Sequence, residues 1–314
     1  MPKEYRQQSW DADVEHDCRQ IVRLAILEDL ERGHDWTTVS LAAENATAAA
    51  DLVARRPGVI AGIEAARIAL EELEIEAAWE PQVADGTRVE RGALVARLRG
   101  SARGLLTAER TLLNLIGRMS GIATLTAQYV AAIAGTGARI YDTRKTTPGW
   151  RRLEKYSVHC GGGHNHRMGL FDGVLIKDNH LALGRQGPQA TRYTPAEAVL
   201  RAKQFLQQHG AGQERFTEMM VEVEVDSLQQ LREVLPAGPD IVLLDNMPPA
   251  MLREAVAIRN ELAPQIELEA SGGITLETIR SVAETGVERI SSGALTHSAI
   301  VLDVALDWEE PRTQ

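Results

Sequence analysis

The chain is poor in cysteine, in aromatic residues and in long apolar runs. Its 314 residues include 2 cysteines, Cys18 and Cys160, which are too few for a framework of several disulfides. No apolar run approaches the roughly 18 residues that span a membrane. The polar start of the sequence lacks the apolar core of a signal peptide. These absences predict a cytoplasmic protein that does not enter a membrane.

Negative charge exceeds positive charge in this chain, but one segment is net positive. Lys and Arg number 34 against 44 Asp and Glu, and the net charge of −10 argues against a general binder of nucleic acid or of anionic membranes. Residues 141–180 reverse this balance and hold three of the five lysines and four of the eight histidines. A solvated basic surface would explain the charge alone, but glycines and short apolar runs make a surface helix a poor fit. The basic residues there are Arg144, Lys145, Arg151, Arg152, Lys155, Arg167 and Lys177.

The first part of the chain mixes helical and strand patterns. Helical spacing of apolar residues covers 14–32, 62–73 and 105–133, and short β-rich runs cover 51–54 and 77–79. The third helical pattern contains Gly117 and Gly121, which indicate close packing against another segment.

From Ala138 onward, short β-rich runs alternate with helical patterns. Such alternation predicts a parallel sheet, and this number of units is that of a β/α barrel, complete or slightly short of strands. The expected strands are 138–141, 173–176, 219–225, 241–244, 266–270 and 288–291. The expected helices include 195–208, 227–235, 249–262 and 276–285.

Polar residues or glycines follow five of these strands. Active sites of β/α barrels lie at the carboxyl ends of the strands, so the residues at these ends are expected to meet in one site. The five strand ends carry Asp142 to Lys145, Lys177 to His180, Asp245 with Asn246, Ser271 to Gly273, and Ser292 with Gly293.

Two strands alternate acidic and apolar residues. Side chains two apart share a face of a strand, so Glu222 and Glu224 are expected to point into the barrel, as are Glu267 and Glu269. Buried carboxylates are costly unless they are paired or hydrogen-bonded. Two interpretations follow: an internal salt-bridge network with the basic segment, or a polar cavity for a charged substrate and a metal.

Two further motifs bear on ligands. Ser271-Gly272-Gly273 and Gly293 precede helical patterns, as in the last two loops of barrels that bind phosphate, although two ordinary helix-starting turns would look similar. Residues 160–167 contain Cys160, His164 and His166, but the lack of a second Cys pair disfavours a zinc site. Arg167 is the better indication, because a guanidinium binds a carboxylate through two parallel hydrogen bonds.

Taken in order along the chain, these stretches resemble quinolinate phosphoribosyltransferase, the carboxylating nicotinate-nucleotide pyrophosphorylase family. The resemblance is carried by 108–114, 142–149, 161–167, 175–180, 221–225, 243–246, 269–273 and 292–294. It implies an α/β protein with an N-terminal α/β sandwich-like domain and an open, seven-stranded α/β barrel. The domains are expected at 1–117 and 118–297, with 298–314 packing back on the first.

The resemblance also implies residue roles. Quinolinate would be held by Arg110, Arg144, His166, Arg167 and Lys177, with Arg110 reaching the site of a neighbouring subunit. Phosphoribosyl pyrophosphate would be held by Lys145, Glu224, Asp245, Ser271, Gly272, Gly273, Gly293 and His297. Lys145, Glu224 and Asp245 would be catalytic, and the two acids would hold Mg²⁺, directly or through water or substrate.

The implied reaction joins quinolinate to phosphoribosyl pyrophosphate and releases pyrophosphate and CO₂, forming nicotinate mononucleotide for NAD synthesis. The implied assembly is a homodimer with shared active sites, or a higher oligomer. Three alternatives remain: a paralogous transferase acting on another pyridine or base, a Schiff-base aldolase using Lys177, and a non-enzymatic sugar-phosphate binder. His159 stands where the family more often has arginine, and its role is unassigned. Residues 184–194 are either a mobile loop over the site or an ordinary connection.

Overall fold

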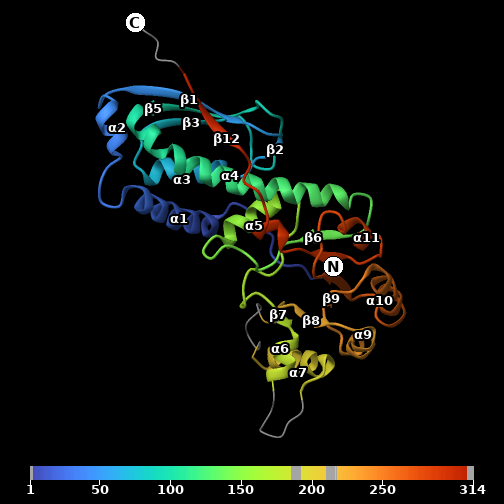
Figure 1. Ribbon diagram of the computed structural model, residues 1–314. Helices are drawn as coiled ribbons and strands as arrows, with labels where there is room; N and C mark the ends of the chain where they lie inside the picture. The colour runs from blue at the N-terminus through green and yellow to red at the C-terminus, as the bar shows by residue number, and fades with distance from the viewer. Residues whose placement is uncertain (1–2, 185–191, 210–215, 217, 310–314) are drawn as a thin grey trace. The chain divides into compact units, whose positions relative to one another are not determined.

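The computed structural model describes residues 3–184, 192–209, 216 and 218–309 and divides them between two compact units (Figure 1). One unit comprises 1–6, 129–144 and 164–294, and the other comprises 7–128, 145–163 and 295–314. The expected boundary after residue 117 is therefore not a single cut, because each unit is assembled from three stretches of chain. Of the expected 184–194 loop, residues 185–191 lie outside the described part.

The unit that starts at residue 7 is built on a four-stranded antiparallel sheet in the order β12-β1-β5-β3. The strands are β1 (Thr47–Ala54), β3 (Ala77–Pro81), β5 (Leu94–Ser101) and β12 (Val304–Trp308), beside a small pair of β2 (Gly58–Val59) and β4 (Arg88–Val89). Its helices are α1 (Ala12–Leu30), α2 (Trp36–Leu41), α3 (Ile63–Glu72), most of α4 (Ala102–Ala132), α5 (Arg151–Cys160) and most of α12 (Ala294–His297). The C-terminal stretch thus adds a strand to the N-terminal sheet.

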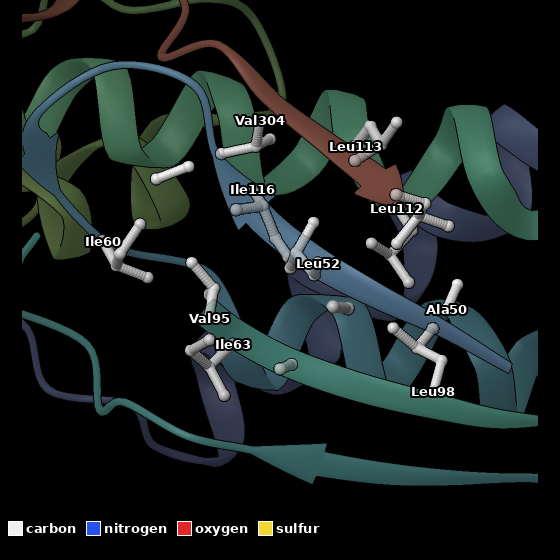
Figure 2. Packing of buried hydrophobic residues seen from close by; sticks show 14 of the residues in the cluster. Ala50, Leu52, Ile60, Ile63, Val95, Leu98, Leu112, Leu113, Ile116 and Val304 are labelled. Atoms are coloured by element: carbon white, nitrogen blue, oxygen red, sulfur yellow. The ribbon is translucent and has the colours of Figure 1, made fainter. Parts of the chain in front are cut away.

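Apolar side chains of this sheet and of α4 form one buried core (Figure 2). Leu52 on β1 and Leu98 on β5 meet Leu112 and Ile116 of the long helix, and each is at most 1% exposed. The predicted close packing at Gly121 is confirmed, because a Cβ there would lie 2.1 Å from the carbonyl oxygen of Ile300. Aspartates cap the first two helices: Asp11 accepts from backbone N–H groups of α1, and Asp35 accepts from one in α2.

The other unit contains a six-stranded, all-parallel sheet in the order β6-β11-β10-β9-β8-β7. The strands are β6 (Arg139–Tyr141), β7 (Val174–Ile176), β8 (Val221–Val225), β9 (Ile241–Asp245), β10 (Glu267–Ser271) and β11 (Arg289–Ser291). The helices are α6 (Asp178–Leu183), α7 (Pro195–His209), α9 (Leu228–Val234), α10 (Pro249–Leu262) and α11 (Ile279–Ala283), with a 3-10 turn at Leu235–Ala237.

The predicted strands and connecting helices are therefore present. A parallel bridge between His164 and Tyr141 adds a seventh, single-residue strand beside β6. Among the described strands, none joins this bridge to β7, so the α/β barrel is open as expected. Strand and helix alternate in this unit because short β-rich runs alternate with helical patterns along the sequence. None of the described helices is long and apolar enough to cross a membrane.

Candidate active site

Ten of the expected site residues belong to the barrel unit. The strand register explains why they gather, since the carboxyl ends of β6 to β11 lie at one edge of the sheet. Ser271 pairs with Asp245, and Ser291 pairs with Tyr141, so the polar residues after these strands begin at matching levels. The ten residues are Arg144, His166, Arg167, Lys177, Glu224, Asp245, Ser271, Gly272, Gly273 and Gly293.

A buried aspartate joins the first two cation-bearing segments. Asp142 follows β6, is fully buried, and accepts hydrogen bonds from the Asn165 side chain (2.7 Å) and from the backbone N–H of His166 (2.9 Å). This contact fixes the stretch that carries Arg167 against the loop that carries Arg144. Asp142 therefore brings together two cations that are far apart in the sequence.

Arg167 is the more buried of these two cations, at 6% exposure, whereas Arg144 is exposed. One guanidinium nitrogen, Nη1, donates to the carbonyl oxygen of Gly173 at 3.0 Å. Burial lowers the pKa of Arg167, and the nearby positive charge of Arg144 adds to that effect. Two cations held this close favour an anion between them, and their planar groups suit a carboxylate.

Lys177 and Glu224 face each other across adjacent strands. In the β7–β8 register Ile176 pairs with Val223, so the next residues of the two strands are level, and the Lys177 ammonium forms an ion pair with Glu224. The Lys177 nitrogen is thus held by a carboxylate, whereas a Schiff-base lysine needs that nitrogen free to attack a carbonyl. The contact argues against the aldolase alternative.

The glycine-rich turn after β10 has a conformation that glycine alone adopts easily. Gly272 and Gly273 have φ of +99° and +60°, and a Cβ on Gly272 would lie 2.2 Å from Oδ1 of Asn246. A Cβ on Gly273 would meet nothing within 4 Å, so its backbone borders open space. Ser271 and both glycines also line a cavity of about 220 Å³. Backbone N–H groups exposed in such a turn suit a phosphate.

Lys145 and His297 belong to the other unit, where they are neighbours. The hydroxyl of Thr296 donates to the carbonyl oxygen of Lys145 at 2.7 Å, which places His297 beside the Lys145 backbone. Buried Glu154 accepts from Arg118 (2.6 Å) and from the backbone and hydroxyl of Thr147. Arg118 also donates to the carbonyl oxygen of Thr296 at 2.5 Å. This network fixes the backbone of the loop, while the Lys145 side chain is exposed.

Arg110 also lies in this second unit, on α4. It is exposed, and among the described residues its guanidinium makes no hydrogen bond or ion pair. Leu106, one turn earlier on the same helix, is 40% exposed. An unpaired cation beside an exposed apolar side chain is free to contact another molecule.

One part of the basic segment does not join the site but forms a largely buried helix, which the sequence patterns did not predict. Residues 151–160 form α5, which packs in the second unit. Arg152 makes ion pairs with Asp13 and Asp17 of α1, and Lys155 is fully buried. His159 is exposed at the end of α5. The helix buries the face that includes Leu153 and Val158, which outweighs its weak propensity.

The acidic residues of β8 and β10 are paired, as the first interpretation expects, although two of their partners, Arg139 and Arg289, lie outside the basic segment. Glu222 and Glu269 are fully buried in an internal network: His166 Nε2 lies 3.1 Å from Glu222, and Arg289 Nε lies 3.1 Å from Glu269. Glu224, by contrast, lies at the strand end with Lys177. These two buried carboxylates are thus paired with His166 and Arg289, and Arg289 lies outside the basic segment.

His166, Glu222 and Glu269 place one possible ligand atom each within 4.8 Å of one another, which is the arrangement of a metal site. The hydrogen bonds argue against it. Burial lowers the pKa of His166, but the two carboxylates outweigh this effect and raise it to about 10, favouring an imidazolium. The backbone N–H of Arg167 donates to Nδ1 at 2.8 Å, which instead favours a neutral ring. Both states keep a proton on Nε2, the nitrogen facing the carboxylates, and a metal would have to displace this proton and its hydrogen bonds.

The buried carboxylate of Glu269 predicts a pH dependence of stability. Burial raises its pKa, but the charges of His166 and Arg289 outweigh this effect and lower it from 4.5 to about 2. A carboxylate with a depressed pKa stabilises the fold above its unfolded pKa and loses that contribution as the pH falls through the folded value. We expect stability to fall as the pH drops from about 5 towards 2, with this group contributing to the fall.

Acid unfolding followed by circular dichroism measures this effect. Glu269→Gln should be less stable at pH 7, because Arg289 loses a partner, and should show a flatter decline of stability below pH 5. Glu254→Gln, at an exposed carboxylate of α10, is the control and should keep the wild-type slope. Equal slopes for wild type and Glu269→Gln would contradict the assignment.

Comparison with known proteins agrees with this geometry. Residues 35–120 match the N-terminal domain and residues 122–307 the C-terminal domain of quinolinate phosphoribosyl transferase. The chain belongs to this family. It is 44% identical over 299 residues to the nicotinate-nucleotide pyrophosphorylase [carboxylating] of Mycobacterium leprae, covering 94% of this chain and 99% of that one. The probable enzyme of that name from Bacillus subtilis is 40% identical, with 92% of each chain covered.

A solved structure supports the same assignment. The nicotinate-nucleotide pyrophosphorylase from Francisella tularensis superposes with a TM-score of 0.85 at 34% identity, covering 98% of this chain and 100% of that one. The family's two domain matches meet near residue 121, inside α4, although the compact units of the structure are interleaved along the chain.

In this member of the quinolinate phosphoribosyltransferase family, sequence reasoning missed several residues that fix the site residues in place without belonging to the expected site themselves. Asp142 was expected only as one member of a strand end, and the sequence did not single out Glu154. Arg289 had a visible signal, because a charged residue within a predicted buried strand needs a buried partner. The N-terminal residues Glu4 and Tyr5 had none, since their partners are more than 130 residues away.

Proposed function

We propose that the barrel unit binds quinolinate through the cations gathered at its strand ends and catalyses phosphoribosyl transfer to it, with decarboxylation. The observation that carries this proposal is that Asp142 fixes the stretch before Arg167 against the loop that carries Arg144, in a chain of net charge −10. Lys177 supplies a third cation at the end of β7. Quinolinate has two adjacent carboxylates, and several converging cations match it better than they match a monocarboxylate.

In the reaction, the ring nitrogen of quinolinate attacks the anomeric carbon of phosphoribosyl pyrophosphate. A carbon–nitrogen bond forms as the carbon–oxygen bond to pyrophosphate breaks. The carboxylate next to the ring nitrogen then leaves as CO₂, the pyridinium holds the electron pair of the broken bond, and a proton replaces the carboxylate. The products are nicotinate mononucleotide, pyrophosphate and CO₂, and no protein nucleophile is needed.

The remaining residues act on the phosphoribosyl group. The turn of Ser271, Gly272 and Gly273, with Gly293, holds the 5′-phosphate through backbone N–H groups. Glu224 stabilises the positive charge that develops on the ribose, once the substrate has replaced Glu224 as the ion-pair partner of Lys177. Lys145 and His297 stabilise the departing pyrophosphate. Both carry exposed side chains on a backbone fixed by Thr296, which suits groups that engage a substrate.

Glu224 and Asp245 would hold Mg²⁺. They offer carboxylate oxygens, the donors that this cation prefers, and they end the adjacent strands β8 and β9. Asp245 Oδ2 accepts from the Asn246 side chain at 2.8 Å, which leaves Oδ1 as the oxygen for a ligand. Bound Mg²⁺ would neutralise charge on the pyrophosphate.

We further propose that the enzyme is a homodimer, or a higher oligomer built from it, and that it works in the cytoplasm. Exposed apolar side chains on α1 and α2, including Leu24 (59%), Trp36 (71%) and Leu41 (83%), support self-association. Arg110 would enter the active site of the partner subunit. Both cysteines are free thiols, which suits a reducing compartment.

Substrate choice tests the main proposal. Incubation with phosphoribosyl pyrophosphate, Mg²⁺ and quinolinate should yield nicotinate mononucleotide and CO₂ in equal amounts. Nicotinate should react at least about 100-fold more slowly, because it leaves buried Arg167 without the anion that it pairs with. Equal turnover of the two acids would favour a paralogous transferase instead. Formation of a nucleotide from a different base, with no product from quinolinate, would also favour a paralogous transferase.

The metal assignment has its own test. Glu224→Gln and Asp245→Asn should each raise the Mg²⁺ concentration for half-maximal rate by about tenfold. Asp240→Asn is the matched control, because Asp240 precedes β9 at the opposite end from Asp245 and contacts the backbone of Val221. If the Mg²⁺ titrations of all three variants overlay that of the wild type, the metal site lies elsewhere.

A further inference from the structure

The N-terminal residues belong to the barrel unit and lie at the starts of its strands. Lys3 forms an ion pair with Asp240, just before β9, at 3.4 Å. Glu4 binds Arg139, the first residue of β6, and Arg289, the first residue of β11, each at 3.0 Å. Tyr5 is 4% exposed and packs with Met220 and Ile241. These residues therefore close the end of the barrel opposite to the strand ends that carry the site.

This segment completes a buried charge network. Arg289 is fully buried and contacts Glu4, Glu267 (3.2 Å) and Glu269 (3.1 Å), with its guanidinium carbon 3.7 Å from the centre of the Tyr141 ring. Burying charges is favourable only when each has good partners. Glu4 supplies one such partner, so the segment contributes to the interior of the barrel and not only to its surface.

Tyr5 extends from this network to the expected quinolinate site. Its ring stacks on the ring of His166, with centroids 4.6 Å apart and planes at 29°. Its hydroxyl donates to Oε2 of Glu222 at 2.9 Å, and the same oxygen lies 3.1 Å from Nε2 of His166. Tyr5 and Glu222 together therefore fix both the plane and the polar edge of the imidazole. His166 in turn accepts the backbone N–H of Arg167 at 2.8 Å.

We propose that Tyr5 and Glu222 are positioning residues for the quinolinate site, acting from the closed end of the barrel through His166 on Arg167. The inference rests on the proposed function of this site. In this proposal the effect of Tyr5 passes through the stacked imidazole. Burial, followed by the charge of Glu222, raises the pKa of Tyr5 above its ordinary value, so its hydroxyl remains a donor.

The test separates binding of the two substrates. Tyr5→Phe keeps the stacked ring and removes the hydroxyl, so Glu222 loses one of the two groups that fix it. We expect KM for quinolinate, and its Kd by calorimetry, to rise about fivefold, the effect of one hydrogen bond. KM for phosphoribosyl pyrophosphate should stay within about twofold. A purely structural role would lower the active fraction, and thus the apparent kcat, without changing either KM.

Tyr141→Phe is the matched control. Tyr141 is also buried, and its hydroxyl donates to Glu4 at 2.7 Å, but among the described contacts it does not join the hydrogen bonds of His166. We expect this variant to lose thermal stability and keep both KM values. Should Tyr5→Phe not fold, Glu222→Gln carries the same test, because it keeps an acceptor for Tyr5 and removes the charge that faces His166.

Each outcome decides between the claims. Wild type that binds quinolinate, with a raised Kd in Tyr5→Phe and an unchanged Kd in Tyr141→Phe, supports the inference. Wild type that binds quinolinate, with an unchanged Kd in Tyr5→Phe or an equal rise in both variants, overturns the inference and leaves the proposed function intact. Wild type that neither binds nor turns over quinolinate overturns the proposed function, and the inference with it.

Discussion

Replacing Lys145 by alanine is expected to lower kcat by about 100- to 1,000-fold and to change the quinolinate KM by less than about threefold. The charge of Lys145 acts mainly when pyrophosphate departs, so its loss raises the barrier more than it weakens substrate binding. Steady-state kinetics with both substrates varied measure the two effects separately.

The structure indicates that Lys145→Ala should leave the fold unchanged. The Lys145 side chain is exposed, and the loop is held through its carbonyl oxygen by Thr296, so alanine removes no packing. Thermal stability should change by less than about 0.5 kcal/mol. Lys145→Arg is the matched control: it keeps the charge and should retain more activity than alanine does. A Lys145→Ala enzyme with wild-type kcat would show that the pyrophosphate is stabilised by other groups.

Mixing two inactive variants is expected to restore activity, which tests the shared site. Arg110→Ala and Lys177→Ala homodimers should each be nearly inactive. After dissociation and reassociation, about half of the dimers should be mixed, and each mixed dimer has one intact site and one site lacking both groups. Activity should return to about a quarter of the wild-type value if the sites act independently.

The design depends on where the structure places each cation. Arg110 is exposed on α4 without a partner among the described residues, whereas Lys177 ends β7 in the barrel unit. Arg144→Ala mixed with Lys177→Ala is the control, since both cations belong to one barrel unit and should not complement. An Arg110 mixture that stays inactive, although mixed dimers form in native mass spectrometry, would rule out the shared site.

The alternation of strands and helices was predictable because it depends on local apolar periodicity. All six predicted strands of the barrel unit are present, with ends that shift by at most two residues. The same reasoning failed at α5, where the basic residues Arg151 and Arg152 and nearby glycines concealed a helix. Its stability comes from packing of Leu153 and Val158, which the charge pattern does not report.

By itself, the sequence determined the class of the fold and predicted which polar residues follow the strand ends. Both follow from short-range patterns, since a parallel strand directs the residue after it to the same edge of the sheet. The tertiary structure decided which groups are paired. Lys177 meets Glu224 through strand register, Asp142 joins Arg144 to Arg167, and Arg118 with Glu154 fixes the Lys145 loop.

Only the tertiary structure placed the N-terminal residues inside the barrel. Tyr5 meets Glu222 across 217 residues of sequence, and Glu4 meets Arg289 across 285. Nothing local marks such pairs, because their free energy arises only when folding removes both charges or polar groups from water and leaves each as the other's partner.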